Sequence, residues 1–349
     1  MPVNKLQYLA QYNYGIALFQ QSQDWSIERA VKVFEGILSS DDVSDELKVM
    51  AHASLAASYS KMAGRHPNRR QEFAQKAIDE ADLVLTSQGM EDAKANAWAA
   101  KGYTHLALGQ LDDAKLMFEG GLRIDVRNIT CLLGLGETYY KLNRPEEAMS
   151  VLKQAAILTP RGGYAHYRIG KLYWGMKDHK NAVDNFRKAS SLPVARLALG
   201  KIFLEDGLLV EALEEFRAAA RLNGHSADAW ENIAWTILEL NDETLFQEAE
   251  EAARRSVQLE KNDTLLWHRR AVLSRCLLKR NKNEKALREA LSAVKLAPEQ
   301  AQAHYALALC EIQVGRKDDA KASLSRVIEL DKKGFWRFDA QKLMRTIDE

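Results

Sequence analysis

The sequence predicts an all-α fold in which short antiparallel helix pairs stack on one another as a solenoid. Three observations support this prediction. Apolar residues recur at helical spacing in paired segments, each pair carries two small residues at matching places, and many pairs recur about 34 residues apart. A single pair cannot bury its apolar face alone and must pack against its neighbours. Because no Pro-, Gly- or Ser-rich linker divides the 349 residues, we expect one continuous array over 1–349.

The plan is clearest in the segment from Ile129 to Gly162. Its apolar residues follow two amphipathic helices, with a tight turn expected at Asn143–Pro145 and a stop at Pro160. Gly136 lies in the first helix and Ala148 in the second. Antiparallel helices cross closely only where no large side chain separates their backbones. The two small residues therefore predict a helix–turn–helix hairpin.

The same two marks recur nine times along the chain. The first helices carry, in order, Gly15, Ala56, Gly102, Gly136, Gly170, Gly200, Ala234, Ala271 and Ala308. The second helices carry Ala30, Ala74, Ala114, Ala148, Ala182, Ala212, Ala249, Ala286 and Ala320. The expected repeats are 8–40, 46–88, 95–128, 129–162, 163–192, 193–226, 227–263, 264–300 and 301–334. A terminal helix over 335–348 is expected to cover the last repeat.

Several repeats depart from the regular length. The first, seventh and eighth carry three extra residues between their helices, at Gln21–Ser26, Asp242–Phe246 and Arg280–Glu284, and the second carries six within Gly64–Arg70. Such insertions are tolerated because the entropic cost of closing a loop grows slowly with its length. The fifth repeat is four residues short, and Pro193 is expected to begin the next helix directly. We expect the superhelical pitch to change between the fifth and seventh repeats.

This pattern resembles the tetratricopeptide repeat family, whose helix–turn–helix units have a period of 34 residues. The residues that carry the resemblance in the fourth repeat are Leu132, Leu135, Gly136, Tyr139, Ala148, Ala155 and Pro160. Trp98, Gly102, Ala114 and Phe118 carry it in the third. The seventh and eighth repeats depart from the family pattern, because Ala253 and Ala290 stand where an aromatic residue or leucine is usual. The resemblance covers about residues 8–334 and implies a right-handed α–α superhelix.

Composition excludes several classes of function. The chain has 49 Lys and Arg against 48 Asp and Glu, so a net charge of +1 gives no electrostatic footprint for nucleic acid or an anionic membrane. No run reaches the ~18 apolar residues of a membrane span, and the polar residues near the N-terminus do not fit a signal peptide. We expect no membrane association and a cytoplasmic protein, with the nucleus as the alternative. Cys131, Cys276 and Cys310 are expected to be small buried residues in a reducing compartment.

No motif announces catalysis, a metal or a cofactor. Gly134 and Gly136 form a GxG pair, but they lie within a helix and lack the third glycine of a dinucleotide site. The eight histidines form no HExxH motif and pair with no cysteine at zinc-ligand spacing. Trp98, Trp230 and Trp267 fall at the position that packs between adjacent helices. We therefore predict a protein that is not an enzyme and needs no cofactor.

The resemblance implies a binding site on the concave face, which first helices line in this family and where partners bind as extended peptides or single helices. Counting along each first helix gives the side chains that point inward. The candidate contacts are Tyr103, Glu137, Tyr140, Tyr164, Tyr167, Arg168, Lys171, Trp174, Lys201, Asn232, Trp235 and Arg269, and the same count directs Asn96, Lys141, Glu231, His268 and Arg275 inward. Tyr, Trp and Arg are typical of protein-binding hot spots, which favours a partner segment with acidic and apolar residues. The alternative is that Tyr164 and Trp174 pack against the neighbouring repeat.

One class of partner is disfavoured by the resemblance itself. Members that grip the acidic C-termini of heat-shock chaperones use Lys and Asn four residues apart in one first helix, Asn in the next, and a Lys/Arg pair in the third. The matching places here hold Ala99 and Tyr103, then Leu133 and Glu137, then Tyr167 and Lys171. The clamp is incomplete, so we do not expect chaperone termini as partners.

These observations predict a non-catalytic scaffold that binds one or more proteins in its groove. The alternative is a scaffold subunit of an RNA-decay or transcription-elongation type of complex, which long irregular arrays of this family resemble. An aromatic and basic groove could stack single-stranded RNA, although the near-zero net charge does not favour nucleic acid.

Overall fold

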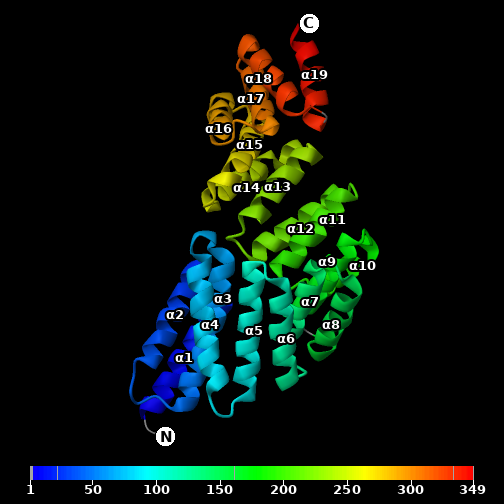
Figure 1. Cartoon of the computed structure of the whole chain (residues 1–349). Helices are drawn as coiled ribbons and strands as arrows, with labels where there is room; N and C mark the ends of the chain where they lie inside the picture. Colours follow the sequence, from blue (N-terminus) through cyan, green and yellow to red (C-terminus); the bar gives the residue numbers. More distant parts are fainter. Residues whose placement is uncertain (1–2, 22, 161, 333, 349) are drawn as a thin grey trace. The chain divides into compact units, whose positions relative to one another are not determined.

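The computed structural model describes residues 3–21, 23–160, 162–332 and 334–348, and it contains helices and turns without a strand in these ranges (Figure 1). The chain divides into two compact units, an N-terminal unit over Met1–Asn185 and a C-terminal unit over Phe186–Glu349, and each is described by itself. The boundary falls within α10 (His179–Lys188). One continuous solenoid with a change of pitch remains a prediction.

The N-terminal unit is built from helices that pair in sequence order. Its helices are α1 (Val3–Gln21), α2 (Asp24–Leu38), α3 (Asp45–Arg65), η1 (Pro67–Arg69), α4 (Arg70–Thr86), α5 (Glu91–Leu108), α6 (Leu111–Ile124), α7 (Ile129–Lys141), α8 (Pro145–Leu158) and α9 (Gly163–Gly175). Odd-numbered helices are the first helices of the predicted repeats, and each packs on the second helix that follows it from α1 to α8. Neighbouring first helices are also in contact: α5 packs against α7, and α7 packs against α9.

The C-terminal unit repeats this plan. Its helices are α11 (Pro193–Glu205), α12 (Leu209–Leu222), α13 (Ala227–Leu240), η2 (Glu243–Leu245), α14 (Phe246–Leu259), α15 (Asp263–Lys279), α16 (Asn283–Leu296), α17 (Ala301–Gln313), α18 (Lys317–Leu330) and α19 (Phe335–Asp348). The predicted terminal helix over 335–348 is confirmed as α19, which packs on α18 and α17. Pro193 begins α11 as predicted.

The turns and insertions follow local chain chemistry. Asn143, at the predicted turn, has a φ of +58°, and α8 begins two residues later at Pro145. Asn241 and Asn281 take the same left-handed conformation, which asparagine tolerates better than most residues. Two of the predicted insertions form short 3-10 helices, η1 and η2. The insertion predicted at Gln21–Ser26 includes a residue outside the described ranges.

The glycine marks make room for a large side chain of the second helix. A Cβ built on Gly102 would lie 2.5 Å from the ring of Phe118, and one on Gly200 would lie 2.5 Å from Phe216. Both rings are fully buried. The small residues lie at the helix crossings as predicted, but the reason for them needs correction. They make room for a ring of the second helix and not for its backbone.

In the seventh and eighth repeats, alanine pairs replace the glycine and the ring. Ala253 and Ala290 stand at the places that Phe118 and Phe216 hold in their repeats, and the corresponding first-helix residues, Ala234 and Ala271, are alanine rather than glycine. All four alanines are 0–1% exposed. Close packing requires the volumes across a helix pair to match, so alanine opposite alanine replaces glycine opposite phenylalanine.

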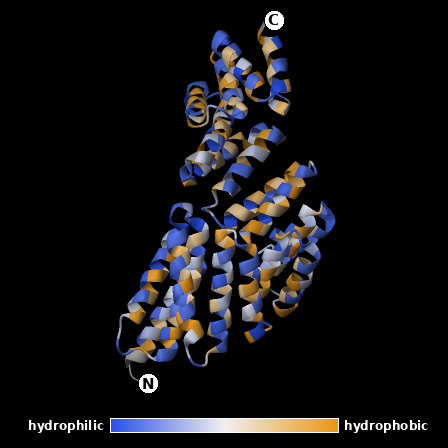
Figure 2. Cartoon of the chain, in the orientation of Figure 1, coloured by the Kyte–Doolittle hydropathy of each residue, from blue (hydrophilic) through white to orange (hydrophobic). Residues whose placement is uncertain are grey.

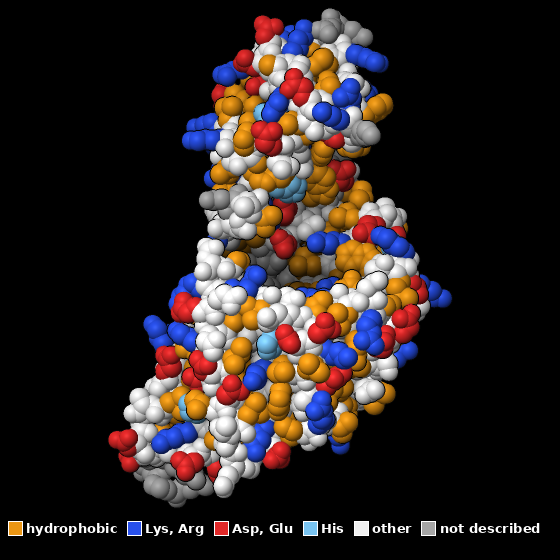
Figure 3. All heavy atoms as spheres, in the orientation of Figure 1, with side chains coloured by type: hydrophobic (Ala, Val, Ile, Leu, Met, Phe, Trp, Pro, Cys, Tyr) orange, Lys and Arg blue, Asp and Glu red, His pale blue; other side chains and the backbone are white. Residues whose placement is uncertain are grey.

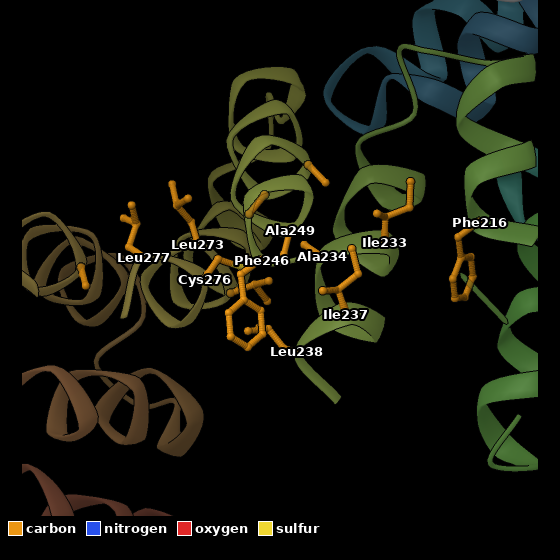
Figure 4. Close-up of a cluster of buried hydrophobic side chains, with 14 of the residues drawn as sticks. Phe216, Ile233, Ala234, Ile237, Leu238, Phe246, Ala249, Leu273, Cys276 and Leu277 are labelled. Carbon is orange, nitrogen blue, oxygen red and sulfur yellow. The ribbon is translucent and has the colours of Figure 1, made fainter. Parts of the chain in front are cut away.

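The apolar faces of the helices meet inside each unit. Hydrophobic and hydrophilic residues alternate around the helices in Figure 2, as a stack of amphipathic helices requires. In the C-terminal unit a buried cluster joins α12, α13, α14 and α15, with Ile237, Leu238, Phe246 and Cys276 among its members (Figure 4). Each repeat thus contributes to the core of its neighbours. Among the described residues, no helix is both long and apolar enough to cross a membrane.

The spaces beside the glycines yield a prediction of stability. Gly102→Ala places a methyl group against the buried Phe118 ring, and such overpacking costs about 1–3 kcal/mol. The matched control is Gly36→Ala in α2, where an added Cβ meets nothing within 4 Å. The control should gain about 0.5–1 kcal/mol from helix propensity. Urea unfolding monitored by circular dichroism measures both, and equal effects of the two substitutions would contradict the packing argument.

The three cysteines yield a second prediction. Cys131, Cys276 and Cys310 are 0% exposed and unbonded to one another, and burial raises the pKa of each thiol to about 12. The thiolate is the reactive form, so a chromogenic disulfide reagent at pH 8 should label none of them in the folded chain and all three in denaturant. Rapid labelling of the folded chain would show that these helix pairs open readily.

Candidate functional site

The predicted contact residues divide between the two units. Eight lie in the N-terminal unit, on three neighbouring first helices: Tyr103 on α5, Glu137 and Tyr140 on α7, and Tyr164, Tyr167, Arg168, Lys171 and Trp174 on α9. Four lie in the C-terminal unit: Lys201 on α11, Asn232 and Trp235 on α13, and Arg269 on α15.

Capping fixes the start of α7 beside α5. The side chain of Asn128 accepts a hydrogen bond from the backbone N–H of Cys131 at 2.9 Å, which satisfies one free donor of the first turn. The same side chain donates to the amide oxygen of Asn96 on α5 at 3.1 Å. Glu137 and Tyr140 follow about two and a half and about three turns further along α7, on the face toward the neighbouring first helices.

An ion pair joins the middle of this face. Nη1 of Arg168 on α9 lies 2.6 Å from Oε2 of Glu137 on α7, and Nζ of Lys141 approaches the same carboxylate at 3.8 Å. Both side chains of the closer pair are about one quarter exposed. Tyr103 packs edge-on against Phe118 with ring centres 5.1 Å apart, and burial raises the pKa of its hydroxyl to about 12. The structure therefore brings together contact candidates from α5, α7 and α9.

Outside this ion pair the face is aromatic and basic. Tyr140 is 42% and Tyr164 is 58% exposed, and Nζ of Lys171 lies 6.0 Å from the centre of the Tyr140 ring. We call Tyr140, Tyr164 and Lys171 the α7–α9 patch. The alternative that Tyr164 packs into the neighbouring repeat is wrong at this exposure. Trp174 is partly buried, as is Tyr167, whose pKa is raised chiefly by burial.

Arg269 differs from its prediction. Its side chain is 3% exposed, and its nitrogens contact three carboxylates: Asp228 at 2.7 Å, Glu231 at 3.0 Å and Glu260 at 2.7 Å. Counting along α15 directed it inward, but a guanidinium surrounded in this way has no surface left for a partner. Arg269 instead forms buried ion pairs that join α15 to α13 and to the segment after α14.

The other C-terminal candidates are less uniform. Lys201 is exposed on α11, whereas Asn232 donates a hydrogen bond to the backbone carbonyl of Asp228 at 2.7 Å. Trp235 stacks on the ring of His268 at 6.2 Å and holds the guanidinium of Arg275 over its own ring at 4.8 Å. Two side chains of α15 therefore contact the indole of Trp235, although part of it stays exposed.

A pocket beside α8 and α9 was not predicted from the sequence. Its volume is about 490 Å³, and it is lined by Pro145, Glu146, Met149, Ser150, Lys153, Tyr173 and Met176. Helical periodicity does not show that residues on two helices leave a hollow between them.

Surface charge is mixed on the face that the space-filling view shows. On the face shown in Figure 3, Lys and Arg side chains alternate with Asp and Glu, and no large area carries one sign. The described residues contain no group of three or more His, Cys, Asp and Glu side chains placed to hold a metal ion.

Comparisons with known proteins agree with this architecture. Models of the tetratricopeptide repeat match residues 105–172, 163–193 and 273–334. Anaphase-promoting complex subunit 3 of Schizosaccharomyces pombe is 27% identical over 229 residues, which cover 61% of this chain and 33% of that protein. The chain thus spans about a third of the length of this curated relative.

Solved structures show the same fold. The structure of pilF from Pseudomonas aeruginosa matches with a TM-score of 0.52 and 18% identity over 61% of this chain and 96% of that one. A chain of the Cut9–Hcn1 hetero-tetramer of the APC/C matches with a TM-score of 0.51 and 14% identity over 100% of this chain and 78% of that one. These likenesses confirm the predicted all-α solenoid class.

The burial of Arg269 yields a prediction of stability. Arg269→Met removes the cation from three carboxylates, two of which, Glu231 and Glu260, are at most 16% exposed. Breaking a buried ion pair from one side costs about 3–5 kcal/mol, because the remaining charge stays buried and unpaired. The matched control is Arg288→Met on the exposed face of α16, which should cost less than about 0.5 kcal/mol. Chemical denaturation measures both, and similar losses would contradict an internal role for Arg269.

Proposed function

The chain belongs to the tetratricopeptide repeat family, and we propose that it is a non-catalytic scaffold that binds a segment of a partner protein along its first helices. The observation that supports this most directly is the α7–α9 patch. Tyr140, which is 42% exposed, lies beside the exposed Lys171 of the adjacent first helix, and Tyr164, which is 58% exposed, stands about two turns earlier on the same face of α9. Exposed aromatic side chains next to a cation are typical of protein-binding hot spots.

The chemistry of the patch favours a partner segment with apolar and acidic residues. The tyrosine rings offer apolar surface with a polar hydroxyl at the edge, and Lys171 offers a positive charge that Glu137 does not neutralise. Arg168 is already paired with Glu137, so its contribution is to hold α9 against α7. An extended peptide or one helix lying across α7 and α9 would contact all three residues of the patch.

The alternative functions have less support. Direct nucleic-acid binding would need a continuous basic path, whereas carboxylates interrupt the basic residues on the face seen in Figure 3. A scaffold subunit that meets nucleic acid only through other proteins would agree with the same patch. Catalysis lacks support from any motif in the sequence or any cluster of chemical groups at the patch.

The proposal is tested by capture of partners with altered patches. Lys171→Glu combined with Tyr140→Ala should weaken binding of the captured proteins by about tenfold or more, since both residues contribute exposed contact surface. Both side chains are exposed, so the helical circular dichroism and melting temperature should not change. Arg168 is left intact because its replacement would also disturb Glu137.

The matched control is Lys153→Glu, which makes the same charge change on the second helix α8. Partners that are lost with the patch variant and kept with the control support the proposal. An identical set of captured proteins from all three baits would contradict binding at the patch.

A further inference from the structure

The terminal helix α19 carries an uncovered stripe on the side away from the core. Phe335 and Phe338 are 66% and 70% exposed, and Lys342 and Arg345 are also exposed. These four residues stand at i, i+3, i+7 and i+10, so they follow one face of the helix. We call them the α19 stripe. It lies in the C-terminal unit and is separate from the α7–α9 patch.

The opposite face of α19 is firmly packed. Ala340 is 0% and Ile347 is 7% exposed, in a cluster with Leu324 and Val327 of α18. The Trp336 ring packs at a tilt of 49° against Tyr305 of α17 with ring centres 5.0 Å apart, and its backbone N–H donates to the carboxylate of Asp331 at 3.0 Å. The orientation of α19 is therefore fixed by its inner face, and the exposure of the two phenylalanines follows from it.

The position of α19 in the stack matches that of a first helix. It packs on α18 and α17 as α17 packs on α16 and α15, and as α15 packs on α14 and α13. Each of those earlier first helices is also covered by the second helix that follows it. On α19, in contrast, the two phenylalanines of the stripe remain 66% and 70% exposed.

Charge indicates what kind of helix would cover the stripe. In an antiparallel pair, the first turn of the second helix lies beside the last turns of the first helix. The second helices of this chain begin with acidic residues, such as Glu146 and Glu147 in α8 and Asp318 and Asp319 in α18. The last turns of α19 present Lys342 and Arg345, which are both exposed. An acidic first turn would complement these two cations.

From these observations we propose that the α19 stripe is a docking surface for an amphipathic helix of a partner protein, lying antiparallel to α19. The first turn of that helix carries acidic residues that meet Lys342 and Arg345. Its apolar face covers Phe335 and Phe338. This mode lays the apolar side of one helix onto an apolar face of the receptor, with charges at one end setting the direction.

A helical peptide of the stated chemistry provides a direct test. The sequence of α12, Leu209–Leu222, has acidic residues at Glu211, Glu214 and Glu215 and an apolar face with Leu213 and Phe216. A fluorescent copy, held helical by one staple on its polar face because short helices are marginal in water, is titrated with the full chain. Fluorescence anisotropy then measures the dissociation constant.

Substitution of the two phenylalanines should weaken this binding. Phe335→Ser with Phe338→Ser should raise the dissociation constant about tenfold or more, as expected for loss of the central apolar contacts of an interface. The matched control, Leu291→Ser with Leu296→Ser, changes exposed leucines of α16 and should leave binding unchanged. Equal binding by the wild-type chain and the phenylalanine variant, or no binding by the wild-type chain, would overturn the proposal.

A charge swap tests the direction of docking. Lys342→Glu with Arg345→Glu should weaken binding several-fold, and a peptide with lysine in place of Glu211, Glu214 and Glu215 should restore it. Failure of the swap to restore binding would overturn the antiparallel assignment. Sedimentation of the chain alone tests whether the stripe binds a second copy of the chain. Self-association that is lost in the phenylalanine variant would assign the stripe to a second copy and overturn the partner-helix proposal.

Discussion

The helix pairs of several repeats are positioned by a buried phenylalanine ring that packs against a glycine of the first helix. Phe118 on α6 shows the arrangement most fully, because it packs against Gly102 of its own repeat and against Gly134 of the next one. A side chain at either glycine would collide with the ring. One phenylalanine thus fixes two helix crossings, and it sets where α5 and α7 lie next to each other. In the next repeat Leu152 of α8 packs in the same way against Gly136 of α7, the helix that carries Tyr140 of the α7–α9 patch.

Charged residues on the same helices divide into internal and exposed groups. Arg168 and Arg269 both use carboxylates of a neighbouring first helix, Glu137 in one case and Asp228 with Glu231 in the other. Such pairs align successive repeats, and they leave the lysines and tyrosines between them as the surface that a partner can reach. A basic residue on a first helix is therefore no guide to binding until its carboxylate neighbours are known.

Periodicity explains why the repeats could be predicted from the sequence. The helix pairs, the turn before Pro145, the start of α11 at Pro193 and the terminal helix all follow from residues within a few positions of each other. The burial of Arg269 could not be predicted in this way, because its partners lie 9 to 41 residues away and meet only after the repeats stack. The same holds for the pocket beside α8 and α9. Helix counting gives the direction of a side chain but not what it meets there.

The exchange of glycine opposite phenylalanine for alanine opposite alanine has a consequence for how such a chain diverges. Starting from Gly200 and Phe216, a single step to alanine at the glycine crowds the ring, and a single step to alanine at the phenylalanine leaves a void. The double change restores the fit, as Ala234 with Ala253 does, but a residue of intermediate size also fills this place. Gly136 packs against Leu152, and Ala308 lies in one buried cluster with Leu324. Leucine in place of the phenylalanine therefore offers a route between the two kinds of hairpin, whereas a direct exchange requires two coordinated substitutions.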